Sequence, residues 1–441
     1  MRRFFCVLDD SYLDILQGGS SFLCMFSSYV WNPKTYRYRF GKERKQMQIG
    51  MGLLAIAIVL GLSYLLSNDK KKMQIRGIGT MLLLQFVTTW FMFTTTIGQS
   101  LINGIAAGFD HLIDFGQAGI GFVVGGFELE EGGVFFFNVL LLIIFFATLL
   151  SVLTYLKVLP ILIKWVGAVV SRLTGLPKIE SFNAVNSIFF GQSEALIAIR
   201  SQFHHLTENR LYIVSASAMS SVSASIIGSY IQIIPAEYVL VALPLNMLSA
   251  LIIASLIAPV KVRKEVDYVD VDDVTQDKSV FEAMSNGALE GGKIALIVAA
   301  NLIAFIASLE LINALIQLML AGVTLQQILG YVLAPLAIFM GIPMDEVVEA
   351  GSIMGTKIVT NEFVAMLEFQ PLMDTFSAKT VGIVSVFLTS FANFSSIGII
   401  AGTVKGIDGE KASIVSAFGL KLLIGSILAS ILSATIVGLF L

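Results

Sequence analysis

The stretch Gly191-Gln192-Ser193-Glu194 places a carboxylate inside an apolar segment, and Thr360-Asn361-Glu362-Phe363 repeats this in a second apolar segment. Each is followed by a small, hydroxyl-rich interruption of a membrane-length segment, at 220–225 and 391–396 respectively. Ionisable groups at membrane depth cost roughly 2.5–3.5 kcal/mol on insertion scales, so they usually line a polar pathway enclosed by protein. Two matching copies predict a transporter built from a duplicated unit.

Composition indicates an integral membrane protein. The chain has 441 residues, of which 56% are hydrophobic and only 13% are charged. A soluble core cannot bury that much apolar sequence. Several runs reach the roughly 20 residues that cross a bilayer, notably Phe135–Leu156, Tyr238–Val260 and Ala412–Leu441. Two cysteines, Cys6 and Cys24, indicate neither a disulfide framework nor a cysteine metal site.

Hydropathy predicts an all-α polytopic membrane protein with about eight transmembrane helices, two re-entrant hairpins and several interfacial helices. The expected spans are Gly50–Leu66, Ile78–Ile97, Gly133–Leu156, Leu211–Ile233, Tyr238–Val260, Ile294–Ile316, Thr380–Val404 and Ala412–Leu441. The expected interfacial helices are Leu101–Phe127, Ile161–Leu173 and Leu325–Gly341.

The two hairpins are expected at Ile179–Phe203 and Glu346–Leu372. In the first, an apolar arm of about a dozen residues lies on each side of 191–194, and at ~1.5 Å per residue each arm covers half a bilayer. A hairpin that turns inside the membrane leaves backbone groups without partners, and these need polar neighbours. Gly191 allows the sharp turn, and Gly398 together with small Ser, Ala and Asn residues is expected to let the second broken span unwind.

Charge placement predicts the orientation. No Lys or Arg occurs from Gly77 to Leu156, so that connection is expected outside, and the basic stretches are expected in the cytoplasm. The loop Lys261–Lys278 is expected to be solvated. Residues 1–46 carry eight basic residues on the side predicted to be external. Either 1–46 is an extension, with Met47 or Met51 as the natural start, or the span count is off by one; we favour the extension.

The four interrupted elements are expected to enclose one polar cavity with two carboxylates, two amides, several hydroxyls and the ring of Phe391. None of the four motifs contributes a cation, which argues against anionic substrates and for a neutral polyhydroxylated ligand or a cation. Lys357 is expected either to extend its side chain to the interface or to pair with Glu349. Small residues such as Ser220, Ser223 and Ser395 are individually more often packing contacts than ligand contacts.

Two other function classes compete with a solute transporter. An ion channel or ion exchanger would use the carboxylates as a cation site. A membrane-embedded enzyme would use Glu194 and Glu362 as acid and base, but no His-Glu-x-x-His, nucleophile elbow or phosphate loop occurs in a suitable context. We therefore expect a protein that is not an enzyme.

Three motifs resemble the concentrative nucleoside transporter family, and most closely the bacterial NupC-type permeases. They are Gly191–Ala195, Lys357–Ala365 and Phe391–Gly398, and the resemblance extends from about Met51 to Leu441. It implies import of nucleosides such as uridine, cytidine and adenosine through a bacterial cytoplasmic membrane, by a homotrimer with no nucleic-acid partner. It also implies two opposed hairpins in inverted repeats that slide past a scaffold in an elevator-like cycle.

The resemblance divides the chain into five parts. These are an N-terminal extension (1–46), scaffold and interfacial helices (47–175), a first transport-domain repeat (176–260), a loop with a scaffold span and an interfacial helix (261–341), and a second repeat (342–441).

The resemblance also assigns roles to individual residues. Gln192, Ser193 and Glu194 would meet the nucleobase side. Glu362, Asn393 and Ser396 would hold the ribose hydroxyls, and Phe391 would pack against the nucleoside. The chemistry agrees, because a carboxylate accepts from two vicinal hydroxyls and an amide both donates and accepts.

Coupling to protons is favoured over coupling to sodium, and no cofactor is expected. Sodium-coupled relatives carry Asn four residues before the tip Gly and Thr in the Gln-Thr-Glu triplet. Here Ser187 and Ser193 stand at those places, with Asn186 one position away. Removal from water favours the protonated form of a carboxyl group, so Glu194 is the candidate proton carrier. The coupling-ion candidates are Glu194, Ser187 and Ser221, and no metal site is certain.

Overall fold

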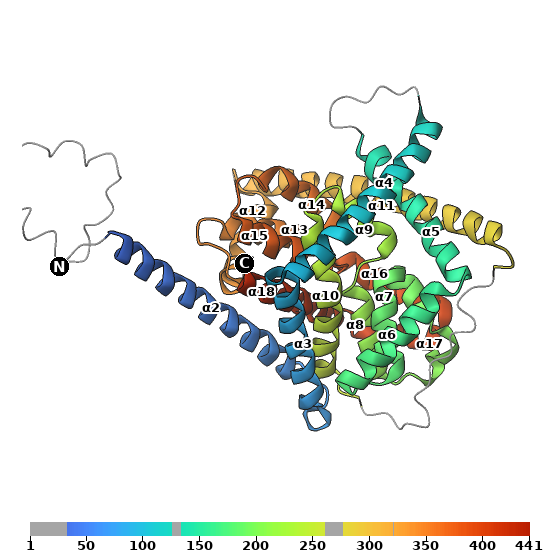
Figure 1. Ribbon diagram of the computed structural model, residues 1–441, viewed down its shortest axis with the longest axis horizontal. Coiled ribbons are helices and arrows are strands. Elements are labelled where there is room, and N and C mark those ends of the chain that lie inside the picture. The colour runs from blue at the N-terminus through green and yellow to red at the C-terminus, as the bar shows by residue number, and fades with distance from the viewer. Residues whose placement is uncertain (1–32, 126–133, 261–276, 321) are drawn as a thin grey trace, which may run out of the picture. The chain divides into compact units, whose positions relative to one another are not determined.

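The computed structural model describes residues 33–125, 134–260, 277–320 and 322–441, and within these ranges all regular structure is helical (Figure 1). The chain divides into two units, Met1–Gly50 and Met51–Leu441, with the boundary inside helix α2 (Pro33–Leu65). Most of the predicted extension, both cysteines and nearly all of the loop predicted at 261–278 lie outside the described residues. Within the described ranges, the helices of membrane length all lie in the second unit.

Among the described residues, six helical segments are long and apolar enough to cross a membrane. They are α3 (Ile75–Thr94), η3 with α5 (Phe136–Leu140 and Leu142–Tyr155), α8 with α9 (Glu208–Met219 and Ala224–Ile231), α10 (Ala236–Ile257), α11 (Val280–Met319) and α18 (Gly419–Phe440). The apolar end of α2 and the pair α15 (Ala378–Leu388) and α16 (Phe394–Ile407) occupy the two remaining predicted spans. The prediction of an all-α polytopic membrane protein is confirmed.

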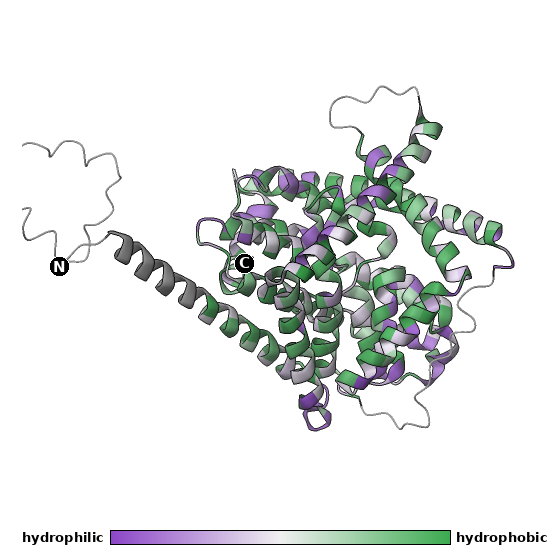
Figure 2. Cartoon of the chain, in the orientation of Figure 1, coloured by the Kyte–Doolittle hydropathy of each residue, from purple (hydrophilic) through white to green (hydrophobic). Residues whose placement is uncertain are grey.

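Inner and outer spans differ in how much of their surface neighbouring helices cover. In the inner spans, neighbouring helices bury most of the most apolar 18-residue stretch: 94% of it in α8–α9, 89% in α10 and 83% in α18. In the outer span α11 the buried share is only 17%. Figure 2 shows that apolar residues nevertheless cover most of these helices. Outer helices therefore present apolar side chains outward, as contact with lipid or with another chain requires.

The inner helices α10 and α18 pack through small residues. Ser433 of α18 donates a hydrogen bond to the hydroxyl of Ser249 on α10, at 2.8 Å, and both side chains are fully buried. Since lipid tails are as apolar as leucine, membrane helices associate through close packing and hydrogen bonds, which small residues permit. The predicted last span, Ala412–Leu441, is shorter than expected, because Asp408 caps a separate helix α17 (Gly409–Ala417) before α18 begins.

The remaining helices include those predicted to be interfacial. They are η2 (Lys70–Lys72), α4 (Thr96–Val124), α6 (Val158–Thr174) and α12 (Leu325–Met340). A capping box formed by Thr324 and Gln327 begins α12. This helix packs closely on the second hairpin, since a Cβ added at Gly330 would lie 2.4 Å from the carbonyl oxygen of Val348.

The first hairpin consists of α7 (Lys178–Ile197) and η4 (Arg200–His205), and the second of α13 (Val347–Val359), α14 (Glu362–Phe369) and η6 (Gln370–Leu372). The prediction of two arms of a dozen residues is wrong for the second arm of the first hairpin. There the α-helix stops at Ile197, and a tighter 3₁₀ turn, polar except for the buried Phe203, replaces it.

Candidate functional site

The first hairpin turns at Gly191, which has φ 66° and ψ −178°, a conformation that only glycine adopts readily. A Cβ at this position would lie 3.0 Å from the Cβ of Ser223 and 3.2 Å from a carboxylate oxygen of Glu194. The tip therefore lies directly against the break between α8 and α9, as the sequence predicts for a tip that faces a broken span.

The second hairpin turns at Thr360 and Asn361. The side chain of Asn361 accepts a hydrogen bond from the backbone N–H of Val364 (3.0 Å) and so caps α14. Glu362 is the first residue of that helix. A carboxylate at a helix N-terminus is stabilised by the unpaired backbone N–H groups and by the positive end of the helix dipole.

The two broken spans meet at their interruptions. The first break comprises Ser220 to Ser223, and the second comprises Thr389 to Asn393. The backbone N–H of Phe391 donates to the carbonyl oxygen of Ser221 (3.1 Å), which joins the two breaks. The expectation that Gly398 unwinds the second span is wrong: Gly398 lies inside α16, which begins where Asn393 caps the N–H of Ser396 (3.0 Å).

Glu362 links the second tip to both broken spans. Its Oε1 accepts from the hydroxyl of Tyr230 on α9 (2.9 Å), and its Oε2 accepts from the side-chain amide of Asn393 (3.0 Å). Glu362 is 5% exposed. Tyr230 was not among the predicted site residues. Its place, at the end of the half-helix that follows the first break, is the signal that could have found it.

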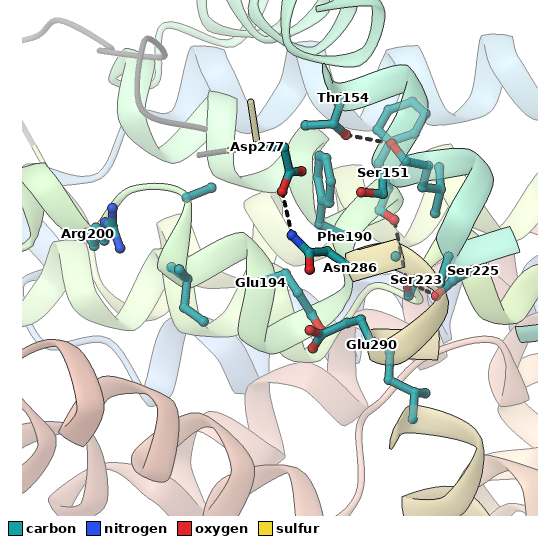
Figure 3. A pocket seen from close by; sticks show the side chains of 17 residues that line it. Ser151, Thr154, Phe190, Glu194, Arg200, Ser223, Ser225, Asp277, Asn286 and Glu290 are labelled. Atoms are coloured by element: carbon teal, nitrogen blue, oxygen red, sulfur yellow. Dashed lines mark hydrogen bonds between the residues drawn. The ribbon is translucent and has the colours of Figure 1, made fainter. Parts of the chain in front are cut away.

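Glu194 lies in different surroundings. It lines a cavity of about 370 Å³ between the first hairpin, α5 and α11, together with Ser223 and Ser225 from the first break. Figure 3 shows the carboxylates of Glu194 and of Glu290, on α11, pointing toward one another. In the described part of the chain, no other side chain donates a hydrogen bond to Glu194.

The second carboxylate of this cavity is Glu290, and Glu362 does not line it. Glu290 was not among the predicted site residues; it stands beside two glycines, Gly291 and Gly292. Arg200, Asp277 and Asn286 also line this cavity.

The remaining predicted substrate residues lie at the tips and breaks. The hydroxyl of Thr403 on α16 donates to Ser193 (3.0 Å). Gln192, Phe391 and Ser396 are buried. The Oε1 of Gln192 and the hydroxyl of Ser396 have no hydrogen-bond partner among the residues that the structure describes. Buried polar atoms of this kind usually have a partner, so these two are available to a ligand.

The predicted coupling-ion serines are hydrogen-bonded to nearby carbonyls. Ser187 donates to the carbonyl oxygen of Asn183 (2.6 Å), and Ser221 donates to that of Ala218 (3.0 Å). The side-chain nitrogen of Asn186 and the hydroxyl of Ser220 are buried without a partner in the described ranges. The oxygen atoms of this region are the ligand type that a hard cation prefers.

Neither expectation for Lys357 is right. The side chain is fully buried, and its ammonium donates to the carbonyl oxygen of Phe387 (2.5 Å) and the hydroxyl of Ser390 (2.6 Å). Glu349 is exposed and lines a different cavity. Lys357, which stands three residues before the motif of the second tip, therefore brings a cation to the second break.

Sequence-family comparisons cover nearly the whole second unit. Residues 54–127 match the family described as "Na+ dependent nucleoside transporter N-terminus", and residues 238–438 match its C-terminus counterpart. Residues 136–237, which include the first hairpin, match a family described as "Nucleoside recognition".

Individual relatives give the same picture. The chain is 39% identical over 391 residues to the purine nucleoside transport protein NupG of Bacillus subtilis, covering 88% of this chain and 98% of the relative. It is 30% identical over 409 residues to the nucleoside permease NupC of Helicobacter pylori, covering 88% and 97%. These relatives are transporters and not enzymes.

The fold is similar to solved structures of CNTnw. The structure of CNTnw in an inward-facing substrate-bound state superimposes with a TM-score of 0.85 at 32% identity, covering 90% of this chain and 98% of that one. A CNTnw variant in an outward-facing state gives 0.85 at 31% identity, covering 90% and 99%. The chain belongs to the concentrative nucleoside transporter family.

Proposed function

We propose that this chain imports nucleosides by ion-coupled symport through a bacterial cytoplasmic membrane, with protons as the coupling ion. The observation that carries the proposal is the Glu362 carboxylate, which Tyr230 and Asn393 hold where the second tip meets the broken spans. A carboxylate has about four acceptor positions. The side chains of Tyr230 and Asn393 occupy two of them, which leaves acceptor capacity for the hydroxyls of a ribose.

The proposed substrate contacts divide between the two repeats. Glu362, Asn393 and Ser396 hold the ribose, Phe391 packs against the nucleoside, and Gln192, Ser193 and Glu194 meet the base. The unpaired buried oxygens of Gln192 and Ser396 support this division, because a bound nucleoside would supply their missing partners.

Proton coupling is assigned to Glu194. Its half-buried carboxylate lines a cavity beside a second carboxylate, Glu290, and is free of side-chain donors in the described ranges. A carboxylate that is open to a cavity and held by no side-chain donor is suited to exchange a proton with that cavity. Ser187 and Ser193 stand where sodium-coupled relatives carry Asn and Thr, which agrees with coupling to protons.

Sodium coupling is the second candidate. The matched families are described as Na+ dependent, and the chain is 28% identical to the sodium/nucleoside cotransporter 1 of Rattus norvegicus, of which it covers 62%. The buried hydroxyl of Ser220, which has no hydrogen-bond partner in the described ranges, favours this alternative, because a hydroxyl oxygen is a ligand that a hard cation accepts.

The proposed cycle is an elevator movement of the two repeats past α5 and α11 in a homotrimer. The existence of inward-facing and outward-facing structures with the same fold supports alternating access. The Glu194 cavity lies between a hairpin tip and these two helices, which is where such a movement would open a path. The exposed apolar surface of α11 supports contact with lipid or a second copy.

Uptake into proteoliposomes tests these proposals. Radiolabelled uridine, cytidine, adenosine and inosine would be offered under an inward proton gradient, an inward sodium gradient and neither gradient. We expect accumulation of at least one nucleoside under the proton gradient. Accumulation under sodium alone, unchanged by pH, would overturn proton coupling, and no uptake of any nucleoside would overturn the transport proposal.

A further inference from the structure

Lys357 is a buried cation that the nucleoside contacts do not use. None of its side chain is exposed, and its ammonium lies 4.4 Å from the ring centre of Phe387. Among the described residues it forms no ion pair, and the carboxylate that acts on it electrostatically is Glu362. An ammonium that is buried without an ion pair costs free energy, and hydrogen bonds offset part of that cost. Charged side chains inside membrane segments usually have a function.

Its hydrogen bonds repair a specific defect in the second broken span. In an unbroken helix the carbonyl of Phe387 would accept from the N–H of Phe391, four residues later. That N–H donates to Ser221 in the other broken span instead (3.1 Å). Lys357 supplies the missing donor, at the helix end where unpaired carbonyls and the helix dipole favour positive charge.

The first repeat lacks an ammonium at the matching place. Ala218 stands one residue before the end of α8, as Phe387 does in α15, and among the described residues its carbonyl accepts only from a neutral side chain, the hydroxyl of Ser221. Ser187 stands four residues before its tip residue, as Lys357 does, but its hydroxyl bonds within its own helix. Of the two repeats, only the second therefore places the ammonium of a side chain at its helix break.

Lys357 also ties three elements together. The hydroxyl of Ser390, which it contacts, is hydrogen-bonded to that of Ser430 on α18 (2.8 Å). Five residues further along the same hairpin, Glu362 binds Asn393 on the other side of the break. The hairpin thus holds the break through one positive and one negative contact, and Phe391 lies between the two break residues that are held.

We propose that Lys357 is a tethered cation. Its ammonium occupies a helix-break position of the kind that broken membrane helices use to bind inorganic cations, and it fixes Phe391 and Asn393 for the substrate without a mobile ion. Lys357 is thus a positioning residue that acts through the break, and it makes the second half of the site independent of the coupling ion.

The test compares Lys357→Ala and Lys357→Met with a control at an exposed lysine, Lys405→Ala. Nucleoside counterflow is measured in symmetrical solutions that contain methylammonium or choline, so that no ion gradient contributes. We expect both Lys357 variants to lose about tenfold or more of the rate, because a charged hydrogen bond is lost and a buried carbonyl is left unpaired. Methylammonium, but not choline, should restore Lys357→Ala several-fold, because it fits the vacated space.

Lys357→Met fills that space with a neutral chain and should not respond, and Lys405→Ala should behave as the wild type. Wild-type rates in Lys357→Met, or no response of Lys357→Ala to methylammonium, would overturn the inference. Should Lys357→Ala transport too slowly to measure, its thermal unfolding decides: a midpoint raised by about 2 °C or more in methylammonium supports the tethered cation, and equal midpoints overturn it.

The counterflow measurements rest on the proposed function, but the thermal unfolding measurements do not. Wild-type protein without counterflow of any nucleoside would contradict the proposed function alone, and unfolding in methylammonium would still test Lys357.

Discussion

The two hairpin tips carry the same residue type in opposite surroundings. Glu194 lines a cavity beside another carboxylate, whereas Glu362 is 5% exposed and accepts hydrogen bonds from Tyr230 and Asn393. A carboxylate held by two donors is suited to a fixed role in binding, and one open to a cavity is suited to exchange a proton. The two tips therefore offer a ligand or a proton different surroundings.

The buried cations of the two repeats also differ, in the partners that they contact. In the first repeat, Arg210 of α8 forms a buried bidentate pair with Glu180 of α7, one of its bonds being 2.9 Å long. In the second repeat, Lys357 is held by a carbonyl and a hydroxyl. One repeat is thus fastened at the base of its hairpin by an ion pair, and the other near its tip by an unpaired cation.

The largest effect is expected from Arg210→Met. The change leaves Glu180 buried without its partner, and breaking a buried ion pair from one side costs about 3–5 kcal/mol. The thermal unfolding midpoint of the purified protein should fall sharply, and uptake should fall with the amount of folded protein.

The double variant Glu180→Gln/Arg210→Met separates a lost charge from lost packing. Removal of both charges should recover much of the midpoint, because no uncompensated charge remains. A double variant as unstable as the single one would show that packing, and not the ion pair, fastens the first hairpin.

Glu362→Gln should abolish transport in every mode. The new amide places an N–H₂ group against the donor of either Tyr230 or Asn393, and one acceptor for the ribose is lost, so uptake should fall about 100-fold or more. Gradient-driven uptake and counterflow are the measurements. Glu368→Gln is the matched control, since Glu368 lies in the same hairpin arm but contacts Gln326 (3.3 Å) and lines a different cavity. Equal effects of the two changes would remove the distinction drawn between the tips.

Glu194→Gln should separate the two modes. Loss of the proposed proton carrier should reduce proton-driven accumulation about tenfold, with a smaller loss of counterflow, which needs no net proton movement. Glu290→Gln removes the other carboxylate of the same cavity and should change accumulation by less than about threefold, since Glu194 remains. Equal losses in both modes of Glu194→Gln would make Glu194 a binding residue like Glu362.

The smallest effect is expected at an exposed ion pair, Asp69 with Lys72 (2.9 Å), which contrasts with the buried pair of Arg210. The hydrogen bond from Lys72 lowers the pKa of Asp69 below its usual 3.8. The stabilisation is therefore present above the unfolded-state pKa and is lost as pH falls through the lower folded-state value. Asp69→Asn should lower the unfolding midpoint by about 1 °C or less at pH 7, converge with the wild type under strong acid, and leave uptake unchanged. A large loss of uptake would mean that this loop has a role beyond a surface contact.

Much of the fold could be predicted, because the length of an apolar run and the residue types at a turn can be read from neighbouring residues in the sequence. Apolar length locates the spans, and Gly191 and Asn361 mark the tips because a turn and a helix cap need those residue types. The break of the second span was predicted at 391–396 and lies at Thr389 to Asn393, but the role given to Gly398 was wrong. The N–H of Phe391 bonds to Ser221, about 170 residues earlier in the chain, a contact that the local pattern does not encode.

The site was predicted less completely. Tyr230, Glu290 and Lys357 each reach it from a helix whose local pattern gives no sign of the partner. Tyr230 resembles any aromatic residue of an apolar helix, and Lys357 resembles any basic residue near a helix end. Their roles depend on which carboxylate or carbonyl the fold brings within about 3 Å, a distance that spacing along the chain does not encode.

The amino-acid sequence by itself determined that the chain crosses a membrane many times, that it contains a duplicated pair of acidic tips and broken spans, and that it resembles nucleoside transporters. Only the tertiary structure decided which tip is open and which is engaged, and that a lysine completes the second break. The physical reason is that hydrophobic length and backbone conformation are local properties, whereas the partners of a buried charge are set by helices that meet from distant parts of the chain.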